Sequence, residues 1–223
     1  MWTDILRCPK SNDRILWLNR KLRASDRDRI GPKAAGLCVL RGLGMRVPSC
    51  FFLTTTAFRE HLETDGLQSR IASLIETCDA ESDRMIPSLE QIRQLIAQKP
   101  LPESLREAIA SAYVRLRSDI VAVRSSATAE DLPGYSFAGQ YETILGVRSL
   151  DECFDAIKRC WASLWTERAY EYRRRNGIDH RQVEMAVIVQ QQIEPDAAGV
   201  AFTLDPVTGS RSRIVIESCR GLG

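Results

Sequence analysis

The sequence predicts an α+β protein in which a mixed sheet is flanked by helices and carries a helical insert. Two observations predict this class. Apolar residues recur at spacings of three and four over residues 67–117, which is typical of amphipathic helices. Short apolar runs such as VAV and MAVIV recur in the second half of the chain, which is typical of buried strands. With 223 residues, 44% of them hydrophobic, the chain is long enough to bury a core of its own.

The first predicted unit is a helix, then a strand, then a second helix. Gly31 and Pro32 mark the start of the first helix, and the strand CFFL (50–53) follows it. The threonines after this strand can cap the second helix. Residues 67–117 are then expected to form a helical insert packed on the sheet. The inward side of the first helix is expected to carry the apolar residues Ala35, Leu37, Val39, Leu40 and Leu43.

The second half of the chain is predicted to be rich in strands. Two strands, 119–125 and 140–147, precede one long amphipathic helix over 149–177, which ends at an Asn-Gly pair. The last predicted elements are strands over 183–193, 199–205 and 212–219.

Composition excludes several classes of function. Lys and Arg total 31 and Asp and Glu total 29, so no surface for nucleic acid or membrane is expected from the net charge of +2. The seven cysteines form no CxxC pair, which favours reduced thiols over a zinc site or a disulfide framework. No secretory signal or membrane span is visible, so a cytoplasmic location is expected. Both histidines, His61 and His180, are expected at or near the surface.

One segment combines a strand end with groups suited to phosphate. In VAVRSSATAEDLPGYSFAGQYET (121–143), Arg124 ends an apolar run and is followed by hydroxyls, beginning with Ser125 and Ser126, and by glycines. Arginine, hydroxyls and closely approaching backbone amides together recognise a polyphosphate. The alternative is that SSATAED only caps a helix and PGYSFAG is an ordinary turn. Neither a P-loop nor a dinucleotide fingerprint is present.

Three ordered motifs resemble one known family. GPKAAGLCVLRGLGMRVPSCFFLTTTAF, VAVRSSATAEDLPGYSFAGQYETILGV, and GVAFTLDPVTG followed by IESCRGLG resemble the N-terminal nucleotide-binding domain of the phosphoenolpyruvate synthase and pyruvate phosphate dikinase family, which includes rifampicin phosphotransferase. The resemblance implies the first lobe of an ATP-grasp-like fold. Residues 1–30 would be an N-terminal extension. Residues 31–223 would be the N-terminal part of the ATP-binding domain, with the insert at about 67–117 and the second lobe lying beyond the chain.

The activity that the resemblance implies is that of an ATP-dependent phosphotransferase of the dikinase type. A phosphoryl group of ATP passes through a histidine on a separate, swivelling domain to pyruvate or a similar acceptor on a further domain. ATP and Mg²⁺ are the implied cofactors, with the magnesium ligands expected beyond residue 223 and no metal site on this chain. The 223 residues alone are expected to be inactive. The alternative is a stand-alone, non-catalytic ATP-binding or regulatory module.

The resemblance also implies site residues. Lys33 matches the family lysine that reaches the ATP phosphates, and Arg124 matches the phosphate-binding arginine, so both are implied catalytic residues. Gly139 and Thr143 fall on the phosphate-covering turn, and Gln190 lies on the strand expected beside the adenine. Taken alone, Lys33 is better explained as a solvated lysine at a helix start, and only together with the other two motifs does it indicate a phosphate contact. Three further residues match motifs of the family without an assigned role: Asp205, Thr208 and Glu217.

Overall fold

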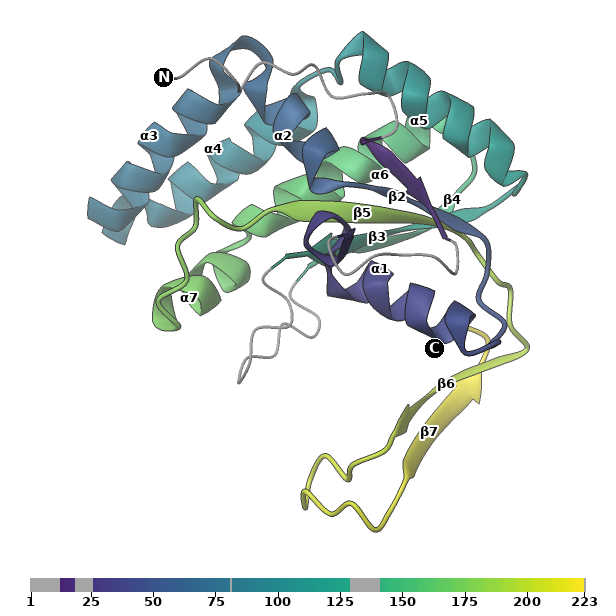
Figure 1. The fold of residues 1–223 in the computed structure, drawn as a ribbon. Coiled ribbons are helices and arrows are strands. Elements are labelled where there is room, and N and C mark those ends of the chain that lie inside the picture. The colour runs from purple at the N-terminus through teal and green to yellow at the C-terminus, as the bar shows by residue number, and fades with distance from the viewer. Residues whose placement is uncertain (1–12, 19–25, 81, 129–140, 223) are drawn as a thin grey trace, which may run out of the picture. The chain divides into compact units, whose positions relative to one another are not determined.

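The computed structural model describes residues 13–18, 26–80, 82–128 and 141–222, and the chain divides into two compact units, Met1–Gln191 and Gln192–Gly223. The first unit is a sheet with helices on both faces (Figure 1). The second is a two-stranded antiparallel hairpin. The combination of helices and antiparallel sheets confirms the α+β class. Among the described residues, no helix combines the length and apolar character needed to cross a membrane.

The sheet of the first unit is antiparallel throughout. Its strand order is β1-β2-β5-β3-β4, and each pair of neighbours is antiparallel. β2 and β3 run in the same direction, but β5 lies between them, so no parallel pair forms among the described strands. The prediction of a mixed sheet was therefore wrong. The strands are β1 (Ile15–Trp17), β2 (Cys50–Leu53), β3 (Val121–Ala127), β4 (Thr143–Val147), β5 (Met185–Gln191), and in the hairpin β6 (Ala197–Phe202) and β7 (Val215–Arg220).

Helices cover the two faces of this sheet unequally. α1 alone packs on one face, whereas α2 to α6 pack on the other (Figure 1). Alternate strand residues therefore enter two different cores: Phe51 faces the large core and Phe52 faces α1. The predicted helical region over 67–117 is confirmed as α3, α4 and α5. The helices are α1 (Arg27–Gly42), α2 (Thr55–Glu63), α3 (Leu67–Ala80), α4 (Met85–Gln98), α5 (Glu103–Leu116), α6 (Leu150–Ala162) and α7 (Glu167–Arg175).

α1 buries only part of the side that was predicted: Ala35 and Leu37 pack, partly buried, against the α1 core. Its side chains at Val39 and Leu43 are 62% and 73% exposed, and the helix instead contacts the sheet through Ala34 and Cys38. These two residues are small, so the helix lies close to Phe52 and its neighbours. Val39, Leu40 and Leu43 are left exposed. The apolar spacing predicted the helix and two of its packed residues correctly, but the prediction was wrong for Val39, Leu40 and Leu43.

The predicted long helix over 149–177 is two helices. A short 3₁₀ turn, Ser163–Trp165, separates α6 from α7. The Thr166 hydroxyl accepts a hydrogen bond from the Ala169 amide at 3.3 Å, which caps the start of a new helix. The break was missed because the apolar residues of the turn continue the helical pattern.

Both histidines are buried, so the prediction that they lie at the surface was wrong. His61 is 0% exposed, with its Nε2 atom 3.1 Å from the Ile96 carbonyl oxygen and its ring stacked on Trp161. The Nδ1 atom of His180 accepts a hydrogen bond from Arg173 Nε at 3.0 Å, and its ring stacks on Tyr170. Aromatic packing and one hydrogen bond each thus hold these rings away from water.

Stability is expected to fall in mild acid because of His61. Burial lowers the pKa of His61 below its ordinary value of 6.5, and the nearby Lys158 and Lys99 act in the same direction, opposed by the bond to Ile96. Below that ordinary value the unfolded chain binds a proton that the folded chain does not bind. The free energy of unfolding should therefore decrease as the pH falls from 7 towards 5. Denaturant titrations at several pH values, with His61→Gln beside the parent, measure this. An identical pH dependence in the two proteins would contradict it.

Candidate functional site

The predicted site residues in the first unit meet on the α1 face of the sheet. Arg124 in β3 lies opposite Thr143 in β4 and Ile188 in β5, and Gln190 is two residues further along β5. Directly opposite residues of antiparallel strands point to the same face. Ile188 belongs to the α1 core, so Arg124, Thr143 and Gln190 share that face with the helix that carries Lys33. Gly139 lies outside the described residues.

Arg124 and Gln190 form a direct pair. Arg124 Nη1 donates a hydrogen bond to Gln190 Oε1 at 3.1 Å, and Gln190 Nε2 donates to the Pro48 carbonyl at 3.5 Å. Gln190 is only 7% exposed, so its amide orients the half-buried arginine. Within the described parts of the chain, Arg124 has no carboxylate partner. Its positive charge and remaining N–H groups therefore suit an anion.

Lys33 reaches the same strand from α1. Gly31 has φ 72° and ψ 167°, a break that starts a new helical turn at Pro32. Lys33 is the next residue, half-buried, and its Nζ donates to the Ser125 carbonyl oxygen at 3.3 Å. The first turn of a helix presents unpaired backbone amides and a positive dipole end, both favourable to anions. A hydrogen bond therefore holds Lys33 at Ser125, the residue that follows Arg124.

The two serines after Arg124 are not available to a ligand. Ser125 and Ser126 are both 0% exposed. The Ser126 hydroxyl accepts a hydrogen bond from the Ala34 amide at 3.4 Å, and the Ser125 hydroxyl is buried without a partner among the described residues. The interpretation that these hydroxyls bind phosphate was wrong. Thr143, which is exposed, keeps an accessible hydroxyl on this face.

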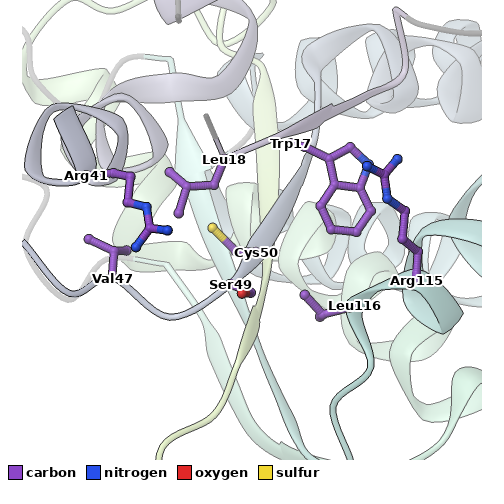
Figure 2. Close-up of a pocket in the computed structure, with 8 residues that line it drawn as sticks. All are labelled: Trp17, Leu18, Arg41, Val47, Ser49, Cys50, Arg115 and Leu116. Atoms are coloured by element: carbon purple, nitrogen blue, oxygen red, sulfur yellow. The ribbon is translucent and has the colours of Figure 1, made fainter. Parts of the chain in front are cut away.

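A pocket of about 150 Å³ lies at the β1 and β2 side of the sheet (Figure 2). Arg41 and Arg115 enter it from opposite sides, and the Arg115 guanidinium lies 4.5 Å from the centre of the Trp17 ring. None of the predicted site residues lines this pocket. Cys50, which does, is the cross-strand partner of Gln190, but burial raises the pKa of its thiol to about 12, so it is no nucleophile at neutral pH. The pocket is lined by Trp17, Leu18, Arg41, Val47, Ser49, Cys50, Arg115 and Leu116.

The residues without an assigned role lie in the second unit. The Asp205 carboxylate accepts hydrogen bonds from the amides of Val207 and Thr208 at 2.9 and 3.1 Å. These bonds close the turn between β6 and β7. They also lower the pKa of Asp205, with the larger effect from Thr208 and a smaller one from Val207. Asp205 therefore has a structural role in this turn. Glu217 is exposed in β7, opposite Val200.

Comparisons with known proteins place the chain in a family. The family model described as "Pyruvate phosphate dikinase, AMP/ATP-binding domain" matches residues 27–223. The chain is 44% identical over 200 residues to a rifampicin phosphotransferase of a Streptomyces species, covering 87% of this chain and 23% of that protein. It is 41% identical over 217 residues to the phosphoenolpyruvate synthase of Aeropyrum pernix, covering 94% and 26%, and 40% identical over 224 residues to that of Escherichia coli K12, covering 96% and 28%.

The chain thus spans about a quarter of the length of these relatives. The match runs through all three motifs that carry the resemblance and through Lys33, Arg124, Thr143 and Gln190. The chain therefore belongs to the family of pyruvate phosphate dikinase AMP/ATP-binding domains, to which phosphoenolpyruvate synthase and rifampicin phosphotransferase are related.

Proposed function

We propose that the chain is the ATP-binding lobe of a phosphoenolpyruvate synthase-like phosphotransferase of the dikinase type, with an ATP-grasp-like fold. In this proposal a phosphoryl group of ATP passes through a histidine on another domain to pyruvate or a similar acceptor. The observation that carries the proposal is the convergence of Lys33, Arg124, Thr143 and Gln190 on one face of the sheet.

Each residue has a distinct part in holding ATP. The planar Arg124 guanidinium, oriented by Gln190, can donate two parallel hydrogen bonds to a phosphate. Lys33 adds a point charge at the helix start, and Thr143 adds a hydroxyl. Transfer of a phosphoryl group depends on positioning and charge stabilisation, which are the contributions that these side chains can make. Gly139 is proposed to cover the phosphates, as in the family motif.

The two histidines of the chain support a relay through another domain. His61 and His180 are buried, and each is engaged in a hydrogen bond and a ring stack. A phosphoryl acceptor must reach the γ- or β-phosphate of bound ATP, which neither ring can do from the core. The relatives are about four times as long as this chain and have room for such a domain.

Magnesium has no fitting residues in the described part of the chain. Within residues 13–18, 26–80, 82–128 and 141–222, no three His, Cys, Asp or Glu side chains come together to hold a metal ion. In the family reading that we propose, the Mg²⁺ ligands lie beyond residue 223, and we derive no step through the ion. The cysteines that the structure describes are free thiols, five of them buried, and this supports the cytoplasmic location that we propose.

Lys33→Ala tests the proposal by comparing two ligands. Loss of a phosphate contact should weaken ATP binding about tenfold, and adenosine, which has no phosphate, should bind as before. Competition binding at millimolar ligand measures both. Arg41→Ala is the matched control, because it removes an exposed cation near the other end of α1 and should leave both ligands unchanged. Equal weakening of ATP and adenosine by Lys33→Ala would count against a phosphate contact.

A further inference from the structure

α1 is broken at Gly31, and this residue and the first turn of the second part of the helix (residues 32–42) contact β3 at three points. Gly31 lies against Ser126, the Ala34 amide donates to the Ser126 hydroxyl at 3.4 Å, and Lys33 Nζ donates to the Ser125 carbonyl at 3.3 Å. Each contact joins residues far apart in the sequence, and in the two hydrogen bonds the partners are 92 positions apart. The start of the helix is therefore held by tertiary contacts rather than by its own preceding residues.

The cap of this helix comes from another element. A helix usually takes its capping hydroxyl from the residue directly before its first turn. That position is Gly31, which has no side chain and whose φ of 72° breaks the helix. Its place is so close to β3 that a Cβ atom there would lie 2.4 Å from both the carbonyl oxygen and the hydroxyl of Ser126. The absent side chain thus leaves room for the serine hydroxyl that caps the Ala34 amide.

We propose that Ser126 is a positioning residue for Lys33: its hydroxyl, on β3, caps the turn of α1 that follows the Gly31 break and so determines where the lysine presents its ammonium group. The inference rests on the proposed function, in which that group contacts the phosphates of ATP. Lys33 is one residue before the capped amide, so fraying of this turn displaces the lysine directly. Ser126 itself is 0% exposed and contacts no ligand in this scheme.

Ser125, the residue directly before Ser126 in β3, supplies a matched control. It pairs with Val187, on the face that packs against the large core, and its hydroxyl is buried without a partner among the described residues. Ser125→Ala therefore removes no hydrogen bond within that part of the chain. Ser126→Ala removes one hydroxyl of the same size from the opposite face.

A double-mutant cycle tests whether Ser126 acts through Lys33. Ser126→Ala should weaken ATP binding about three- to thirtyfold, from the loss of one cap, and should leave adenosine binding unchanged. Ser125→Ala should bind both ligands as the parent does. In a Lys33→Ala background, Ser126→Ala should cause no further loss. A hydroxyl that contacted phosphate itself would weaken ATP binding by the same factor in both backgrounds, and that result overturns the inference. Titrations of ATP into the 223-residue chain and its variants supply all the constants.

Amide hydrogen exchange without nucleotide separates this inference from the proposed function. The Ala34 amide should exchange faster in Ser126→Ala and at the parent rate in Ser125→Ala; unchanged exchange in Ser126→Ala overturns the cap. If Lys33→Ala binds ATP as the parent does, the proposed function fails and the positioning role fails with it, even where the exchange data support the cap. If Ser126→Ala does not fold, Ser126→Cys replaces it, because the thiol is only a weak hydrogen-bond acceptor. Like Ser126→Ala, it should speed exchange of the Ala34 amide and weaken ATP binding.

Discussion

Replacing Gly31 with alanine is expected to destabilise the protein by about 2 to 6 kcal/mol. The glycine has φ 72°, where a side chain strains the backbone by about 1 to 3 kcal/mol. The new Cβ would also lie 2.4 Å from the Ser126 backbone oxygen, so β3 or α1 must shift, which adds about 1 to 3 kcal/mol. Urea unfolding measures the loss.

Gly36→Ala is the control for this change. It lies in the same helix, and a Cβ there would meet nothing within 4 Å. Because alanine favours the helix over glycine by up to about 1 kcal/mol, this variant should be as stable as the parent or slightly more stable. Equal stability of the two variants would show that the close approach of Gly31 to β3 is not needed.

Arg124→Ala is expected to weaken ATP binding about tenfold to a hundredfold, the largest expected effect on the site. A charge-assisted hydrogen bond contributes about 1.5 to 3 kcal/mol, and here the same change also leaves the buried Gln190 oxygen without its donor. Isothermal titration with ATP and a melting curve of each variant measure the two effects separately.

Arg124→Lys separates the charge of the side chain from its shape. Lysine keeps the positive charge but cannot donate two parallel hydrogen bonds to one phosphate or keep the same bond to Gln190. Its affinity for ATP should therefore lie between those of the parent and Arg124→Ala. An unchanged dissociation constant in Arg124→Ala, with an unchanged melting temperature, would remove this residue from the site.

Several elements could be predicted because their signals are local. The helices over 67–117 follow from apolar spacing and the strands from short apolar runs, since each signal depends on neighbours within a few residues. The break at Thr166 was also a local signal, a capping threonine, but the continuing apolar pattern concealed it. Lys33 and Arg124 could be put forward as site residues because each occupies a fixed place in a short motif, and their part in the site stays a prediction.

Contacts between distant segments decided the rest. β5 lies between β2 and β3 and makes the sheet antiparallel, and this order depends on pairings across more than fifty residues. His61 is held in the core by Trp161, which stacks on its ring from a distant part of the sequence.

The motif residues Ser125 and Ser126 show the same division within two positions of the chain. Composition alone indicated that the hydroxyls of both serines bind phosphate. Because side chains alternate along a strand, however, Ser125 points into the large core and Ser126 lies beneath α1. The local sequence therefore predicts which residue types belong to the proposed site and whether each lies on a strand or a helix. Their meeting on one face, and the bonds from β3 that hold the second part of α1 beside Arg124, arise only when strand register and helix packing bring together groups that are far apart along the chain.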